Sequence, residues 1–69
     1  MPEIAYYTKE QIKAERFRLN LTQENLADLS YLSVQTVRSI EAGRSATPSN
    51  LLLLTYVLQD YEDYYMEEE

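Results

Sequence analysis

The apolar residues of this chain recur three and four residues apart, which is the spacing of one face of an α-helix rather than the alternation of a strand. Helix-ending residues are rare, because the 69 residues include one glycine and two prolines. The pattern therefore predicts an all-α bundle that forms a single domain over residues 1–69.

Polar residues mark both ends of the first predicted helix. Thr8 followed by Gln11 has the arrangement of a capping box, so we expect a helix over about residues 9–19. Asn20 follows, and asparagine is one of the few non-glycine residues that adopt the left-handed conformation often found beyond a helix end.

Two short helices follow with only about three residues between them. Thr22 is placed to cap the first, Ser33 to cap the second, and Gly43 lies where a glycine is expected after a helix. Helices this short bury little surface between themselves. A helix-turn-helix over about residues 22–43 does, however, present its second helix so that the outer face can enter a DNA groove about 12 Å wide.

The last part of the chain predicts two further helical segments. Thr47 can cap and Pro48 suits a first helical position, so "NLLLLTYVL" is expected to continue as a helix to about residue 58. Four consecutive leucines are also compatible with a buried strand, but the cap and the leucine spacing favour a helix. Asp60 is placed to cap a final short helical turn through Tyr64 or Tyr65.

A helical wheel assigns the faces of the second short helix. With Val37 and Ile40 towards the core, Gln35 and Ser39 face away from it. Val34 and Arg38 lie on one flank, and Thr36 lies on the other. Glutamine can pair with adenine, arginine with guanine or phosphate, and valine with a thymine methyl group. Val34 is equally compatible with a place at the edge of the core. For Gln35, an ordinary exposed position is the less favoured alternative.

The segments "RLNLTQENLADLS", "LSVQTVRSIEAG" and "TPSNLLLL" resemble the Cro and phage-repressor-like helix-turn-helix domains of bacteria and their phages. The resemblance covers about residues 9–60. It implies a compact five-helix bundle, with a central helix-turn-helix, that binds double-stranded operator DNA as a homodimer and controls transcription.

The resemblance and the wheel together define the expected DNA-binding residues. Gln23 stands where helix 2 of the family opens, and its amide and the helix N-terminus suit a phosphate. Arg44 is a second phosphate candidate. The predicted set is Gln23, Ser33, Val34, Gln35, Thr36, Arg38, Ser39 and Arg44.

Three further positions are interpreted through the resemblance. It implies a buried ion pair between Arg16 and Glu41, which joins the first helix to the end of the recognition helix. Tyr31 stands in the turn where the family usually has glycine. A tyrosine with positive φ costs about 1 to 2 kcal/mol, so either the turn is strained or it adopts another shape.

The fourth helix has more apolar residues than one inward stripe requires. Leu51, Leu54 and Leu58 suffice for the core, which leaves a surplus for helix 5 or another subunit to cover. The resemblance places dimer contacts in the same region. We expect a homodimer interface that includes Leu52, Leu53, Tyr56, Tyr61 and Tyr64. The rival interpretation is a protein-interaction module that holds a toxin, another repressor or the transcription machinery.

Charge is distributed unevenly along the chain. Residues 1–49 balance six basic against six acidic side chains, and the net charge of −6 comes from the acidic, tyrosine-rich segment 60–69. The neutral half and the short Ser39 favour the rival interpretation. The acidic segment could bind a hard cation, but a solvated tail is the simpler interpretation, so no metal site is expected.

The composition argues against catalysis. The chain has neither cysteine nor histidine, so it lacks thiolate ligands, imidazole ligands and the usual general base. We therefore expect no enzymatic activity and no cofactor. No stretch is long and apolar enough to span a membrane, and the N-terminus lacks the features of a signal peptide. The expected location is the cytoplasm.

Overall fold

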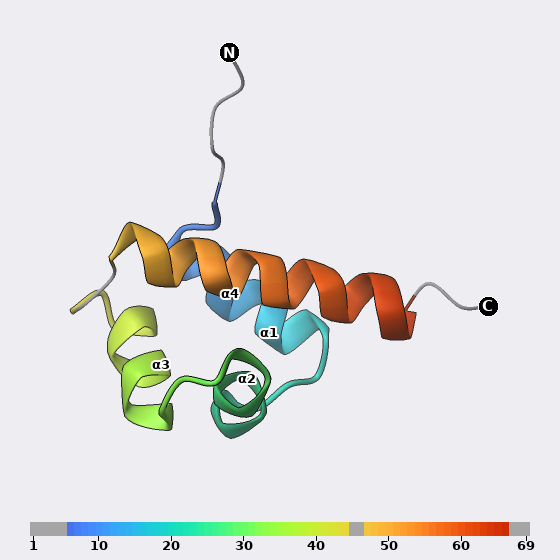
Figure 1. The fold of residues 1–69 in the computed structure, drawn as a ribbon, viewed down its shortest axis with the longest axis horizontal. Coiled ribbons are helices and arrows are strands. Elements are labelled where there is room, and N and C mark those ends of the chain that lie inside the picture. Colours follow the sequence, from blue (N-terminus) through green and yellow to red (C-terminus); the bar gives the residue numbers. More distant parts are fainter. Residues whose placement is uncertain (1–5, 45–46, 67–69) are drawn as a thin grey trace, which may run out of the picture.

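The computed structural model describes residues 6–44 and 47–66, and these residues form four α-helices and one π-helical turn. Helix α4 runs along one side of the molecule with α1 beside it, and α2 and α3 lie on the same side of this pair (Figure 1). The elements are α1 (Lys9–Arg18), α2 (Gln23–Ser30), α3 (Val34–Glu41), α4 (Pro48–Tyr61) and the π-helical turn η1 (Glu62–Met66).

All four α-helices begin at a hydroxyl side chain, as the sequence predicts. In each case the oxygen accepts a hydrogen bond from the backbone N–H three residues later, which satisfies one of the free donors of the first turn. The capping box of Thr8 and Gln11 is confirmed, and Thr22 and Asn25 form a second one. The four capping residues are Thr8, Thr22, Ser33 and Thr47.

The first three helices also end in the same way. Asn20, Tyr31 and Gly43 follow them with φ of 62°, 61° and 80°, and this reversal lets the next backbone N–H reach back to the last turn. The bonds that result run from Leu21 N to Arg16 O (2.9 Å), from Leu32 N to Ala27 O (3.1 Å) and from Arg44 N to Ser39 O (2.9 Å). The left-handed conformation expected of Asn20 is thus confirmed. Tyr31 also adopts the left-handed conformation (φ 61°, ψ 29°), so of the two alternatives the sequence leaves for this turn, the strained one is found.

The core collects apolar side chains from all four α-helices and from the α1–α2 connection. Thr55 of α4 is also buried, and its hydroxyl donates to Leu51 O (2.7 Å) while it accepts from the backbone N of Tyr7 (2.8 Å). The backbone at Tyr7, just before α1, is thereby fixed to α4. The buried apolar residues are Ile12, Leu19, Leu21, Leu26, Ala27, Val37, Ile40, Leu54 and Leu58.

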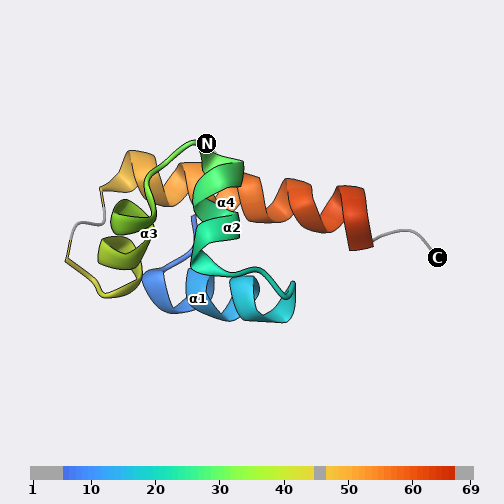
Figure 2. The ribbon, with the colours of Figure 1, turned by 90° about the horizontal axis from the view of Figure 1, so that it is seen from below.

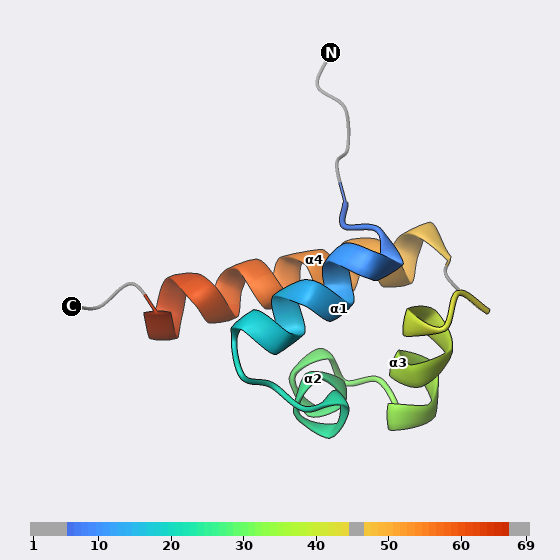
Figure 3. The same cartoon turned by 180° about the vertical axis from the view of Figure 1, so that it is seen from behind.

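The expectation of five separate helices is wrong. Helix α4 continues past residue 58 to Tyr61, and Asp60 lies within it instead of capping a new helix. Its last residue leads directly into η1, because Glu62 keeps helical backbone angles (φ −62°, ψ −46°). No glycine or proline interrupts this stretch, so the backbone has no local reason to break. Figure 3 shows the resulting single rod, seen from behind.

None of the helices in residues 6–44 and 47–66 combines the length and the apolar character that crossing a membrane requires.

Candidate nucleic-acid interface

Helices α2 and α3 form the helix-turn-helix, and the core holds α3 by one face. Val37 and Ile40 are completely buried, which leaves the opposite face of α3 directed outward. Seen from below, α3 lies at one end of the molecule and η1 at the other (Figure 2). The described part of the acidic segment therefore does not cover α3.

The predicted DNA-binding residues divide into exposed and half-buried groups. Ser33, Gln35, Arg38 and Arg44 are exposed, whereas Gln23, Val34, Thr36 and Ser39 are half-buried. Val34 packs against the core cluster, so only part of its side chain is accessible.

The start of α3 has its own hydroxyl pair. Ser33 accepts from the backbone N of Thr36 (3.1 Å), and the two side-chain oxygens lie 2.9 Å apart. Ser33 therefore caps α3 and orients Thr36. Arg44 is the third residue after the C-terminal end of α3, and its backbone N–H donates to the carbonyl oxygen of Ser39.

Arg16 and Glu41 form a buried ion pair between α1 and the last turn of α3. Arg16 donates from Nε to Oε2 of Glu41 (2.7 Å) and from Nη2 to Oε1 (2.9 Å), and from Nη1 to Leu21 O (3.0 Å). The two side chains are 7% and 4% exposed. The guanidinium thus satisfies a carboxylate and a backbone carbonyl at once, and it fixes the end of α3 relative to α1.

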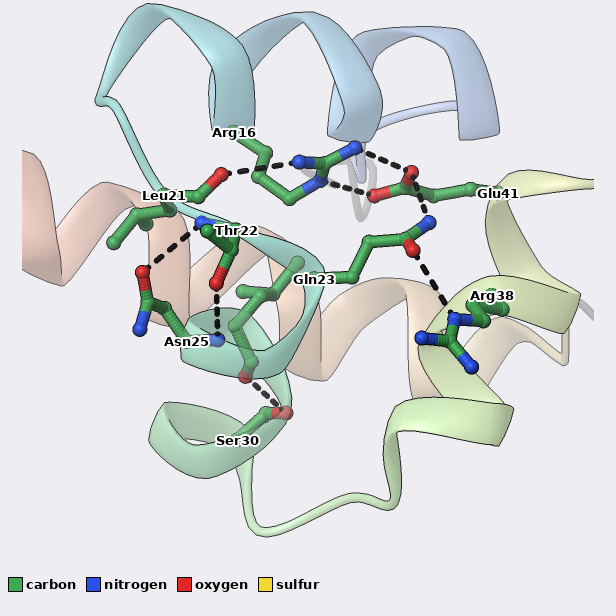
Figure 4. Close-up of polar contacts among 9 residues, drawn as sticks. Arg16, Leu21, Thr22, Gln23, Asn25, Ser30, Arg38 and Glu41 are labelled. Carbon is green, nitrogen blue, oxygen red and sulfur yellow. Dashed lines mark hydrogen bonds and ion pairs between the residues drawn. The ribbon is translucent and has the colours of Figure 1, made fainter.

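Gln23 connects this ion pair to the outer surface (Figure 4). Its Nε2 donates to Oε1 of Glu41 (3.2 Å), and its Oε1 accepts from Nε of Arg38 (3.3 Å). Because the amide is held at both ends, the buried carboxylate sets the orientation of Gln23, and Gln23 in turn orients Arg38. Two residues that the sequence assigns separately to DNA binding therefore form one unit.

Sequence reasoning missed Glu24 as part of this surface. Its Oε2 lies 3.3 Å from Nη2 of Arg38, and both side chains are exposed. A carboxylate beside a guanidinium competes with any phosphate for it. The pairing joins residues 14 positions apart on two helices, so no local sequence signal reports it.

Lys9 was missed for the same reason. A Cβ on Gly43 would lie 2.7 Å from Cε of Lys9, so the lysine side chain crosses the C-terminal end of α3. Its Nζ contacts Glu10 (2.7 Å), and this contact is the main reason why the pKa of Glu10 is lowered. The packing of α1 on α3 thus adds a basic side chain beside Gly43, which directly precedes Arg44.

The residues expected at the dimer interface lie along the outer side of α4 and in η1. Tyr56 and Tyr64 are 56% and 76% exposed and Leu53 is 36% exposed, while Leu52 and Tyr61 are half-buried. Residues 45–59 contain no charged side chain, so the part of α4 that carries Leu52, Leu53 and Tyr56 contributes no charge of its own.

The described residues contain no group of three or more acidic, histidine or cysteine side chains placed to hold a metal ion. What the fold offers instead is a short helix anchored on one face, with polar and basic side chains on the other. That arrangement defines the class of helix-turn-helix DNA-binding regulators.

Comparison with protein families agrees with this class. Residues 12–59 match the family model described as helix-turn-helix, of the Cro/C1 type, and the match covers more than two thirds of the chain. The chain therefore belongs to the Cro/C1-type helix-turn-helix family, whose members are DNA-binding regulators of transcription. No curated protein matches the chain.

Proposed function

We propose that this protein is a sequence-specific transcriptional regulator, of the repressor or Cro type, that reads operator DNA in the major groove with α3. One observation carries the proposal. Val37 and Ile40 are completely buried and hold α3 on the core, while Gln35 and Arg38 on its outer side are exposed. A helix held in this way can enter the groove without any change in the core. The proposal includes no catalytic activity, no cofactor and a cytoplasmic location.

Base contacts in this proposal come from the outer side of α3. Gln35 pairs with adenine through its amide, and the accessible part of Val34 meets a thymine methyl group. Ser39 contributes a short hydroxyl contact. Arg38, held by Gln23, reaches a guanine or a phosphate.

Phosphate contacts come from the edges of the motif. Gln23 and the N-terminal amides of α2 face one strand, since a helix N-terminus favours an anion. Ser33 and Thr36 offer hydroxyls at the start of α3, and Arg44 offers a charge beyond its end. These contacts fix the register of α3 in the groove, and the base contacts supply the specificity.

We also propose a homodimer, because the basic groups of one subunit are few and two half-sites would double the phosphate contacts. The surface of Leu52, Leu53 and Tyr56 suits a two-fold contact, in which the same patch of both subunits meets without charged residues of α4. Tyr61 and Tyr64, which the sequence also assigns to the dimer, lie farther along the chain among acidic residues, so the proposed contact does not include them.

The experiment is a titration of the protein against genomic DNA fragments, including its own promoter region, at low salt. We expect at least one fragment to be bound in preference to random DNA of equal length. Gln35→Ala should lose about 1 to 3 kcal/mol of that preference, because a bidentate base contact is removed. Gln59→Ala, an exposed glutamine on α4, is the matched control. Equal selectivity of Gln35→Ala and the parent protein would contradict the proposal.

One observation favours a second candidate, a protein-interaction module. Leu29, Tyr64 and Tyr65 remain exposed around the far end of α4, where neither the core nor the proposed DNA face uses them. A toxin, another repressor or a component of the transcription machinery could bind such a surface.

A further inference from the structure

A hollow of about 240 Å³ lies where α4 and η1 extend beyond the C-terminal part of α2. The rod projects past α2 on the side away from α3, as Figures 1 and 2 both show. We call this hollow the tyrosine groove. It is lined by Leu29, Val57, Asp60, Tyr61, Tyr64 and Tyr65.

The aromatic wall of the tyrosine groove is preassembled. The ring of Tyr65 lies 4.5 Å from that of Tyr61 and 4.7 Å from that of Tyr64, between centroids. Tyr64 and Tyr65 are nevertheless 76% and 58% exposed. Tyr61 packs against the core, and Tyr64 and Tyr65 extend its ring outward into a large amphipathic surface with few rotatable bonds, which is typical of protein interfaces.

The π-helical turn, which carries Tyr64 and Tyr65, contacts α1. Nη2 of Arg18 contacts Glu15 (2.6 Å) and Glu62 (2.7 Å), and these two contacts raise the pKa of Arg18. The bridge to Glu62 spans 44 residues and holds the start of η1 against the rest of the molecule. The tyrosine groove is thus linked to α1 by an ion pair that both side chains make at the surface.

The surroundings of the tyrosine groove are acidic. Asp60 and Asp63 line an adjoining hollow with Tyr64, and Asp28 lines a third one with Leu29 and Tyr61. No lysine or arginine lines any of these three hollows. The sequence from residue 45 onward contains no basic residue at all. The tyrosine groove therefore has aromatic rings inside it and acidic side chains, Asp28, Asp60 and Asp63, around its edge.

We propose that the tyrosine groove binds a cationic amphipathic segment of another protein. Its apolar side chains lie on Leu29 and the tyrosine rings, and its lysine or arginine side chains face Asp28, Asp60 and Asp63. The rings also offer their faces to the cations, which adds cation–π attraction. This surface is separate from α3, so the inference does not depend on how the protein reads DNA.

Charge decides against the other occupants. A second copy of the chain, placed symmetrically on the tyrosine groove, would bring two acidic patches, each with Asp60 and Asp63, close together. A nucleic acid would meet the same negative rim. A cationic segment pairs with it, and the charge also speeds association.

The experiment measures binding of three fluorescein-labelled helical peptides by anisotropy at physiological salt. One peptide combines lysine and leucine, the second has the same charge but glutamine in place of leucine, and the third combines glutamate and leucine. We expect the lysine/leucine peptide alone to bind well, with amide NMR shifts concentrated at Leu29 and residues 57–65. Equal binding of the two lysine peptides would overturn the proposal, because charge alone would then explain it.

Matched variants separate the tyrosine groove from the proposed dimer surface. Tyr64→Ala should weaken the lysine/leucine peptide about tenfold and leave self-association unchanged, and Tyr56→Ala should do the reverse. The pair Asp60→Asn and Asp63→Asn should weaken the peptide about fivefold, mainly through slower association. Loss of the dimer in Tyr64→Ala would overturn the proposal, since a second copy would then occupy the groove.

Discussion

Arg16 on α1 and Glu41 at the end of α3 form a two-point ion pair across 25 residues of sequence, and their side chains are almost completely buried. The pair also orients the side chain of Gln23, which accepts a hydrogen bond from Arg38 and so orients that side chain. The same contact therefore supports both the fold and the proposed DNA face.

Removal of Arg16 alone should strongly destabilise the protein. Arg16→Met leaves the Glu41 carboxylate buried without its cation, which costs about 3 to 5 kcal/mol, whereas Arg16→Met with Glu41→Leu should recover much of that loss. Urea unfolding followed by circular dichroism measures both variants. A loss below about 1 kcal/mol for Arg16→Met would show that the buried pair contributes no more than a surface one.

Glycine at position 31 should stabilise the protein. Tyr31 is 96% exposed and holds φ at 61°, so its ring contributes little packing while its Cβ makes the backbone strained. Tyr31→Gly should raise the free energy of unfolding by about 0.5 to 1 kcal/mol, which is the strain relieved less the greater flexibility of unfolded glycine. Tyr31→Ala removes the ring but keeps the strain, so it serves as the control and should change stability little. If Tyr31→Ala raised the free energy of unfolding as much as Tyr31→Gly, the effect would come from loss of the ring and not from relief of backbone strain.

Glu24 should weaken DNA binding in the natural sequence. Its carboxylate lies beside Arg38 and would face the phosphates, so Glu24→Gln should tighten DNA binding about threefold to tenfold at low salt and less at high salt. Asp63→Asn makes the same change of charge in η1, at the end of the molecule away from α3, and should have little effect. Equal tightening by both variants would mean that only net charge matters.

Self-association should depend on the uncharged part of α4. Tyr56→Ala removes a ring that is 56% exposed in the subunit, and it should increase the dimer dissociation constant about tenfold in analytical ultracentrifugation. Tyr65→Ala removes a ring of similar exposure, 58%, beyond this surface and is the matched control. A parent protein that stays monomeric at every concentration tested would exclude the proposed homodimer.

The bridge from Arg18 to Glu62 should control local opening of η1 more than global stability. Exposed ion pairs contribute little to the free energy of unfolding, so Arg18→Gln should change it by less than about 1 kcal/mol. Amide hydrogen exchange at residues 61–66 should nevertheless become faster, because η1 loses its contact with α1. Lys13→Gln, on an exposed position of α1, should leave this exchange unchanged. Unchanged exchange in Arg18→Gln would mean that η1 needs no such support.

The sequence by itself determined the helices and the family. Thr8, Thr22, Ser33 and Thr47 each act on a backbone group three residues away, and Asn20 acts on its own backbone, so these signals can be read locally. Helical spacing likewise identified Val37 and Ile40 as buried, because a rigid helix has a fixed period.

Only the tertiary structure decided how the proposed sites are assembled. The contacts of Arg38 with Glu24, of Lys9 with the end of α3, and of Arg18 with Glu62 join residues 14 to 44 positions apart. Helix α4 also continues directly into η1, where the sequence predicted a separate fifth helix. This continuous helical stretch projects past α2 and forms one side of the tyrosine groove. Local propensity acts over about one helical turn, whereas side chains on different helices meet only where packing of the core places them.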